Sequence, residues 1–181
     1  MGRRTPDPLA HPERLTQSVY AYVAYRIGSG PDAEDATSEV FARALRYKSK
    51  FDSSRGTSIA WLLGIARRVL AERANDDRLT VAEVPDAAAP GALEDDSVNR
   101  VTMQSAVATL GERDRELVAL RYGADLTAAQ IGELLELSPN AVEVALHRAL
   151  RRLRAELEAD AAPKPRAQCS PTSTPSTADG V

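Results

Sequence analysis

The stretch that decides the fold runs from Thr127 to Arg154 and reads TAAQIGELLELSPNAVEVALHRALRRLR. Thr127 followed by a glutamine three residues later is typical of a helix start in which side chain and backbone cap each other. The Leu-Ser-Pro turn at 137–139 then begins a second helix, because serine accepts from orphan amides and proline suits the first helical position. The stretch therefore predicts two short helices joined by a tight turn.

The second of these helices has two distinct faces. Apolar side chains recur at spacings of four, three and four residues and so share one buried side: Val142, Leu146, Ala149 and Leu153. At about 100° per residue, the opposite side carries Asn140, Val144, His147 and Arg151. A helix-turn-helix with a basic second helix has the geometry of a major-groove DNA reader. The alternative is an ordinary helical hairpin whose basic face is merely solvated.

Composition predicts an all-α chain. Aromatic residues make up 4% of the 181 residues, while Ala, Leu and Arg dominate and strand patterns are nearly absent. The formal charge of −3 conceals two opposite blocks. Residues 43–73 hold eight basic side chains and two acidic ones, whereas residues 76–98 hold seven acidic side chains and one basic one. These blocks favour a protein with a basic binding surface and an acidic linker. They argue against a protein that binds a polyanion over its whole surface.

Several features point to the cytoplasm. The single cysteine, Cys169, lies in a polar tail, so the sequence predicts no disulfide framework and fits a reducing compartment. The N-terminal residues include prolines and charges but no apolar segment of the kind found in signal peptides. No apolar run approaches the roughly 18 residues that a membrane span needs. We therefore expect no membrane insertion.

The chain divides into two small helical domains joined by a flexible linker. Residues 1–13 contain three prolines and are expected to form a flexible arm. The first domain, at 14–75, should hold helices over 14–27, 32–47 and 58–75. The linker is expected over 76–97, which lacks an apolar face and contains two prolines and a glycine.

The second domain is expected over residues 98–158. It should begin with helices over 98–110 and 112–122, with Gly123 as the C-terminal cap of the latter, and end with the helix-turn-helix. Residues 159–181 are rich in Pro, Ser and Thr and are expected to be disordered. The second domain therefore carries the predicted DNA reader.

The loop YKSKFDSSRGTS at 47–58 is a second candidate site. It interleaves the aromatic residues Tyr47 and Phe51 with lysines and an arginine. Rings stack on bases and cations hold phosphates, so this pattern indicates single-stranded nucleic acid. Both aromatic residues fit equally well as core residues that close the domain. On the preceding helix, Asp35 and Glu39 form an acidic edge, for which a solvated face is the alternative.

In combination, these blocks resemble bacterial RNA polymerase sigma factors of the extracytoplasmic-function type, within the sigma-70 family. The stretch DAEDATSEVFARALR at 32–46 resembles the helix that docks on the polymerase clamp. The stretch FDSSRGTSIAWLLGIARR at 51–68 resembles the loop and helix that open and read the −10 element. The stretch at 112–153, from ERDRELVALRYG to HRALRRL, resembles the reader of the −35 element. The resemblance covers residues 14–155.

The resemblance implies roles for individual residues. Those at polymerase-contacting positions are Asp35, Glu39 and Phe41. Those at −10 positions are Lys48, Lys50, Phe51, Asp52, Arg55, Trp61, Arg67, Arg68 and Arg73, of which Trp61 is favoured as a core residue. Those at −35 positions are Thr127, Asn140, Glu143, Val144, His147, Arg148 and Arg151, where His147 fits a DNA contact and a solvated histidine equally well.

The sequence departs from the family pattern at several positions. Ser38 stands where glutamine is frequent, Arg68 where asparagine is common, and Glu136 where glycine is usual in the turn. Glu143 and Ala145 replace basic residues at the start of the reading helix. A glutamate there repels phosphate but can accept from cytosine N4. We therefore expect an altered −35 preference and a weaker grip on phosphate.

The implied function is that of a non-catalytic specificity subunit. It would bind core RNA polymerase, place the second domain on the −35 duplex and capture the melted −10 strand with the first domain. Stacking and pocket contacts would offset the free-energy cost of flipping a base out of the strand. No cofactor or metal is expected. The resemblance also suggests an anti-sigma partner, and the acidic linker is hypothesised to mimic nucleic acid in the polymerase channel.

Three other functions also fit parts of the sequence. A stand-alone helix-turn-helix regulator would bind DNA without polymerase. A metal-dependent enzyme built on Glu34, Asp35 and Glu39 is disfavoured, because the chain has only two histidines and no metal-ligand spacing. A pure protein-docking module would leave the basic loop at 47–58 unexplained.

Overall fold

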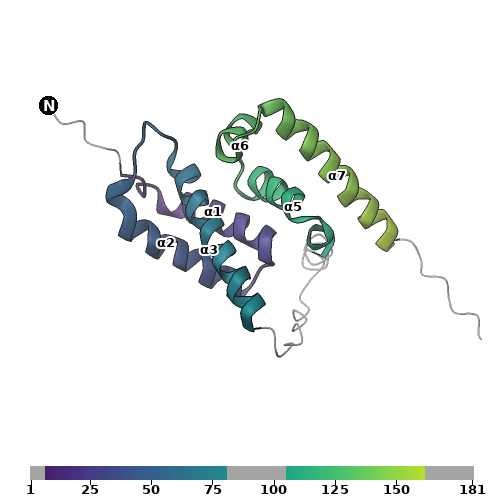
Figure 1. Cartoon of the computed structure of the whole chain (residues 1–181), viewed down its shortest axis with the longest axis horizontal. Helices are drawn as coiled ribbons and strands as arrows, with labels where there is room; N and C mark the ends of the chain where they lie inside the picture. Colours follow the sequence, from purple (N-terminus) through teal and green to yellow (C-terminus); the bar gives the residue numbers. More distant parts are fainter. Residues whose placement is uncertain (1–6, 81–104, 162–181) are drawn as a thin grey trace, which may run out of the picture.

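The computed structural model describes residues 7–80 and 105–161, with side chains described over 7–76 and 105–158. Four segments lie outside the described residues: the arm before residue 7, residues 81–97 on which the linker hypotheses rest, the first part (98–104) of the helix expected over 98–110, and the tail from residue 162. The remainder of that expected helix is helical over residues 105–109. Within the described ranges every regular element is helical, which confirms the predicted all-α class. The elements, labelled in Figure 1, are α1 Pro12–Ile27, α2 Pro31–Tyr47, η1 Lys48–Lys50, α3 Ser58–Thr80, α5 Glu112–Val118, η2 Ala119–Gly123, α6 Ala128–Leu135 and α7 Pro139–Ala161.

The first body consists of α1, α2 and α3 and follows the predicted periodicity closely. Pro12 and Pro31 occupy helix starts, where the missing amide proton costs nothing. Gly28, with φ 92°, ends α1, because that conformation favours glycine. The buried side of the body comes from all three helices: Val19, Tyr22, Val23, Ala33, Ala36, Val40, Ala44, Leu62, Leu63, Ala66, Val69 and Leu70.

The last helix of the first body is longer than expected. The sequence predicted that α3 would end near residue 75, but it continues to Thr80. Residues 76–80 contain neither glycine nor proline, so nothing in them breaks a helix that is already formed. The charged composition of this segment led to its interpretation as part of the linker.

The second body begins with α5 and the π-helical turn η2, in which the Ala124 amide donates to the Ala119 carbonyl at 3.0 Å. The prediction that Gly123 is the C-terminal cap is wrong, because η2 extends through Gly123 and its C-cap is Ala124. Asp125, with φ 54°, takes the left-handed conformation instead, and Gly123 lies outside that region. Gly123 has a different role: a Cβ atom there would lie 2.9 Å from the Tyr22 backbone nitrogen. Its glycine therefore permits the backbone of η2 to touch the backbone of α1.

The helix-turn-helix consists of α6 and α7 and has the predicted caps. The Gln130 amide donates to Thr127 Oγ1 at 3.3 Å, and the Thr127 amide donates to Gln130 Oε1 at 2.9 Å. The Ala141 amide donates to Ser138 Oγ at 3.2 Å. Glu136 has φ 57°, which confirms that a residue other than glycine holds the left-handed position of the turn. Such a conformation costs roughly 1–2 kcal/mol for an L-residue.

Replacing Thr127 with alanine is expected to destabilise this body by about 1 kcal/mol, because the Gln130 amide loses its acceptor. The measurement is the urea midpoint followed by far-UV circular dichroism. Thr127→Ser is the matched control, since it keeps the hydroxyl acceptor and should stay near wild type. A midpoint for the alanine variant equal to that of the serine variant would contradict the assigned role of the cap.

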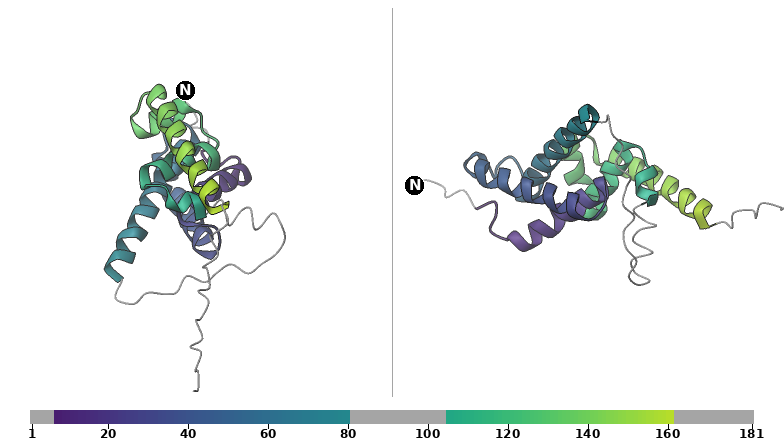
Figure 2. Two further views of the ribbon diagram at one scale, coloured as in Figure 1. Left: turned by 90° about the vertical axis from the view of Figure 1, so that its right-hand side faces the viewer. Right: turned by 90° about the horizontal axis from the view of Figure 1, so that it is seen from below.

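The two bodies share one core. Buried residues of α1 form a single apolar cluster with residues of the second body: Leu117, Ala119, Leu120, Ala124, Leu126, Ile131, Val142 and Leu146. A smaller cluster on the far side of α5 joins helical residues 105–109 to α7 through Val107, Val118 and Leu153. The contact is made mainly by η2 on α1. Figure 2 shows the second body lying against the first. Sequence reasoning expected two bodies joined by a linker and did not foresee this contact.

Candidate nucleic-acid interface

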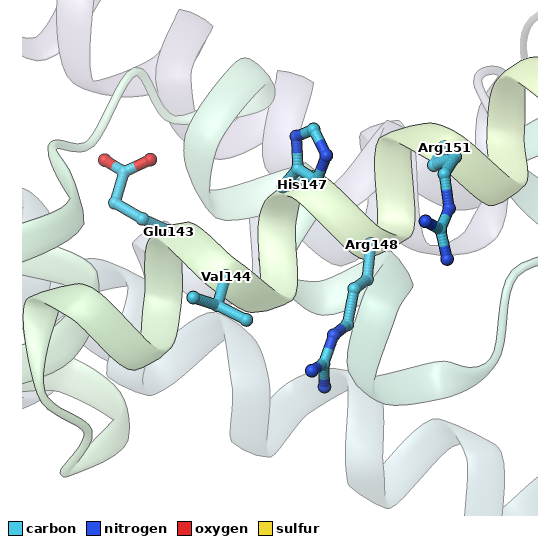
Figure 3. A pocket seen from close by; sticks show the side chains of 5 residues that line it. All are labelled: Glu143, Val144, His147, Arg148 and Arg151. Carbon is cyan, nitrogen blue, oxygen red and sulfur yellow. The ribbon is translucent and has the colours of Figure 1, made fainter.

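The outer face of α7 carries a row of exposed side chains. The four predicted core residues of this helix are buried, so the opposite face is turned to solvent. Glu143, Val144, His147, Arg148 and Arg151 line a shallow groove of about 570 Å³. Figure 3 shows that Glu143 and His147 project from one side of α7, whereas Val144 and Arg148 project from the other. Val144 is 42% exposed, which leaves an apolar group free for contact.

A neighbouring groove extends this face toward α5. It has a volume of about 450 Å³ and is shared by Asn140, Val144 and Arg148 of α7 with Arg113 of α5. Asp114 pairs with Arg152 across the same groove. Sequence reasoning missed Arg113, because its distance from the reading helix in the chain hid their proximity. It supplies a further cation beside Arg148 of α7.

Thr127 is the one predicted −35 residue with a demonstrated local partner. Its side chain is exposed but serves the capping box of α6. The other predicted −35 residues, Asn140, Glu143, Val144, His147, Arg148 and Arg151, are all exposed on α7. The structure thus gathers these six residues on one helix face.

The loop after α2 is polar and partly preorganised. Asp52 accepts from the Ser54 hydroxyl at 2.7 Å and from the Ser54 amide at 2.9 Å. These bonds, the hydroxyl first, hold the pKa of the Asp52 carboxyl below its usual range. Lys50 lies over the Tyr47 ring at 5.1 Å from its centroid, and Lys48 donates to Asp7 at 2.7 Å. Arg55 is exposed.

The aromatic residues of the loop have unequal exposure. Phe51 is 7% exposed and packs on Trp61, with 5.4 Å between ring centroids. Trp61 is half-buried against the core, as the sequence predicted. Tyr47 is exposed. In this conformation the Phe51 ring is not available for base stacking, which agrees with the core alternative that the sequence left open.

The three predicted −10 arginines of α3 differ in their surroundings. Arg67 Nε donates to Glu116 Oε1 of α5 at 2.6 Å. Arg73 is half-buried and donates to the Asp32 carbonyl at 3.4 Å and to Glu39 at 3.5 Å. Arg68 is exposed. Only part of this basic stripe therefore faces solvent.

The acidic edge of α2 is divided in the same way. Asp35 is exposed on the surface of α2. Glu39 is half-buried and accepts from Arg43 and Arg73. Phe41 packs against the core while remaining partly exposed. The edge thus offers one free carboxylate and one carboxylate that is neutralised within the body.

Over residues 7–76 and 105–158, no three His, Cys, Asp or Glu side chains gather in a way that could hold a metal ion. None of the described helices combines the length and apolarity that crossing a membrane requires. The arrangement of exposed groups is that of a helix-turn-helix DNA-binding protein with a second, basic helical body.

Comparison with known proteins narrows this class. The family model for Sigma-70 region 2 matches residues 13–79, and that for Sigma-70 region 4 matches residues 100–153. The chain therefore belongs to the sigma-70 family, and its sequence relatives are of the extracytoplasmic-function (ECF) type.

Two relatives and one solved structure illustrate the relationship. The chain is 32% identical over 157 residues to the ECF RNA polymerase sigma factor BldN of Streptomyces coelicolor, a match that covers 82% of this chain but 60% of that protein. It is 29% identical over 152 residues to the ECF sigma factor SigK of Mycobacterium ulcerans, covering 78% and 80% of the two chains. The fold resembles that of the sigma factor RpoE of Bartonella quintana, whose structure was solved in complex with the anti-sigma factor NepR. The TM-score is 0.65 at 17% sequence identity, and the match covers 81% of this chain and 93% of that chain.

Proposed function

We propose that this protein is a sigma factor that directs core RNA polymerase to specific promoters and supports initiation there. Family membership over both bodies supports this reading. The observation that carries it is the exposed face of α7, held at a fixed angle by a capped turn and bearing side chains for major-groove contact. Catalysis belongs to the polymerase, and this role places the chain in the cytoplasm.

The second body, with the segment before it from residue 98, is assigned to the −35 duplex. Arg148 and Arg151 hold phosphates or base edges, and Val144 offers an apolar contact for a thymine methyl group. Asn140, Glu143 and His147 complete the set. His147 is exposed beside Glu143, so a base contact and a solvated role both remain compatible with its position.

The first body, residues 14–75 with the extension of α3, is assigned to the polymerase and to the −10 strand. Asp35 supplies a free carboxylate for a basic patch of the polymerase, and Glu39 and Phe41 shape the surface beside it. On the −10 side, the exposed residues are Lys48, Lys50, Asp52 and Arg55 in and beside the loop and Arg68 on α3. Phe51, Arg67 and Arg73 serve this strand only after their present contacts change.

Regulation through an anti-sigma protein is a further part of the proposal. Structural relatives of this fold were solved as complexes with such proteins, NepR in one case and the cytosolic domain of CnrY in another. Whether this chain has such a partner is tested by co-purification from cells that express it. Binding that depends on both bodies supports the proposal, and a clean single-component preparation counts against it.

The deciding experiment is runoff transcription with purified core enzyme on a pool of genomic promoters. We expect initiation at discrete start sites only when the chain is added. Gel shifts with and without core enzyme separate this function from that of a stand-alone helix-turn-helix regulator. Strong sequence-specific binding by the chain alone, without any initiation, would favour the regulator.

Replacing Arg113 with alanine is expected to weaken promoter binding by the assembled holoenzyme roughly equally for all sequences. The reason is that an exposed arginine beside Arg148 holds phosphate rather than a base, so its loss should reduce the slope of log K against log salt by about 1. The measurement is promoter affinity across a salt series. Arg14→Ala, which removes an exposed arginine of α1, is the matched control and should leave the slope unchanged.

A further inference from the structure

The carboxylate of Glu39 is held by two guanidinium groups from different helices. Its Oε1 atom accepts from Arg43, one turn later on α2. Its Oε2 atom accepts from Nη2 of Arg73 on α3 at 3.5 Å. The Glu39 side chain is 36% exposed, so it lies at the surface although both of its oxygens are engaged. Two donors that arrive from different directions restrict the carboxylate to one orientation more strictly than a single ion pair does.

Both arginines are themselves anchored between α2 and α3. Arg43 also pairs with Glu72 of α3 at 2.7 Å. Its hydrogen bonds to Glu72 and Glu39, in that order, raise the pKa of the Arg43 guanidinium above its usual value. Nη1 of Arg73 donates to the Asp32 carbonyl, in the first turn of α2, at 3.4 Å. A continuous row of contacts thus joins the two helices: Glu72, Arg43, Glu39, Arg73 and the Asp32 carbonyl.

Arg73 is directed toward α2 and lies far from the −10 loop. It is twelve positions beyond Trp61 on α3, which is about 18 Å along a helix that rises about 1.5 Å per residue. At about 100° per residue, Arg73 and the exposed Arg68 point to sides of α3 that are about 140° apart. The side of α3 that carries Arg73 therefore faces the acidic edge of α2.

We propose that Arg43 and Arg73 are positioning residues for polymerase binding, because they hold the Glu39 carboxylate in the orientation in which the polymerase contacts it. Arg73 keeps its contacts with α2 and takes no part in strand capture. The inference rests on the proposed function, in which the acidic edge of α2 binds the polymerase.

Glu39 retains the capacity to bind a partner in this arrangement. An ionised carboxylate has about four acceptor positions, and Arg43 and Arg73 occupy two of them. Because Glu39 is partly exposed on the same edge as Asp35, its remaining positions can accept from a cationic group of the polymerase. A side chain that is already ordered loses less conformational entropy on binding, which corresponds to roughly two- to tenfold in affinity.

The sign of the effect separates positioning from net charge. Removing Arg73 makes the edge of α2 more negative, so a basic patch attracted only by the field of this edge would bind the variant more tightly. Removing Arg73 also allows Glu39 to adopt other rotamers, so a patch that contacts the carboxylate in one orientation would bind the variant more weakly. We expect the weaker binding.

The first measurement is the affinity of the full-length chain for purified core RNA polymerase. Arg73→Ala should weaken this affinity by roughly two- to tenfold. The second measurement is capture of a −10 non-template strand by the assembled holoenzyme at saturating polymerase, with a promoter recovered by runoff transcription. Arg73→Ala should leave this capture unchanged. Arg14→Ala, at an exposed arginine of α1, is the matched control and should change neither quantity.

A double-mutant cycle separates positioning from a merely structural role. If Arg73 acts through Glu39, its replacement has no further effect on the affinity for core polymerase once Glu39 is alanine. If Arg73 acts only through the stability of the first body, its replacement lowers the affinity equally in both backgrounds. The cycle therefore compares Arg73→Ala in the wild-type chain with Arg73→Ala in the Glu39→Ala chain.

Weaker binding of Arg73→Ala to core polymerase, with no such effect in the Glu39→Ala background, supports the inference. Unchanged or tighter binding, or an equal loss in both backgrounds, overturns it. A loss of strand capture at saturating polymerase overturns it as well, because Arg73 would then serve the −10 strand. If Arg73→Ala fails to fold, Arg43→Gln enters the same cycle and decides by the same criteria. Failure of the wild-type chain to bind core polymerase overturns the proposed function instead, and that result involves no variant.

Discussion

Replacing Leu120 with alanine is expected to lower the free energy of unfolding by about 2–5 kcal/mol. Leu120 is fully buried in η2 and belongs to the apolar cluster that includes residues of α1. Truncation removes its transfer free energy and leaves a cavity, because a core bounded by helices from both bodies can collapse only in part. At about 2–4 °C per kcal/mol for a chain of this size, the melting temperature should fall clearly.

The two bodies are expected to unfold in one transition, so the loss of stability should be detected in both. Trp61 lies in the first body, and Leu120 lies in the second. Because the two bodies share one core, the variant should lower the thermal transition seen by Trp61 fluorescence as well as that seen by circular dichroism. Leu45→Ala, at a side chain that is 64% exposed, is the matched control and should change stability by less than about 0.5 kcal/mol. An unchanged Trp61 transition in the Leu120 variant would show that the bodies unfold independently.

Local patterns were sufficient to predict much of the second body. The capping box, the serine at the start of α7 and its four buried residues all depend on contacts within a few residues in the chain. Helical periodicity and capping both depend on residues a few positions apart in the chain, so a short stretch of sequence is enough to predict them. The special conformation of Glu136 was expected for another reason, because the family resemblance places a glycine at this position of the turn.

The contact between the two bodies could not be predicted in this way. Arg67 and Glu116 are 49 residues apart, and no sequence pattern near either residue predicts that they form an ion pair. Gly123 was interpreted from its position after a helix, where a cap is the common role of glycine. Its actual role depends on the approach of α1, which only the packed structure reveals. Contacts between residues distant in the chain depend on the packing of the whole core, so no short stretch of sequence predicts them.

The loop at 47–58 is an intermediate case. Its mixture of rings and cations favoured nucleic acid, yet the same rings could close the domain. Phe51 is buried on Trp61, whereas Tyr47 is exposed beside Lys50. A ring's exposure depends on how the chain returns to α3, so composition alone could not distinguish the two aromatic residues.

Replacing Glu143 with glutamine is expected to abolish a preference for cytosine at one position of the −35 element. Glu143 is exposed at the start of α7, on the same side as His147. A carboxylate accepts from cytosine N4 but offers no donor to guanine or thymine acceptors, so a good contact discriminates by about 1–3 kcal/mol. Selection of bound −35 variants by the reconstituted holoenzyme should therefore show a loss of roughly five- to 150-fold in that preference.

Charge reversal at the same position separates base reading from repulsion. Glu143→Lys should strengthen binding to all −35 sequences, because it removes a carboxylate near the phosphates and adds a counterion-releasing contact, so the salt slope should steepen by about 1. Glu156→Gln, at an exposed glutamate of α7 beyond the groove, is the matched control and should leave the selected sequences unchanged. If the glutamine variant selects the same bases as wild type while the lysine variant still binds more tightly, Glu143 acts only through repulsion and the altered promoter preference must come from other residues of α7.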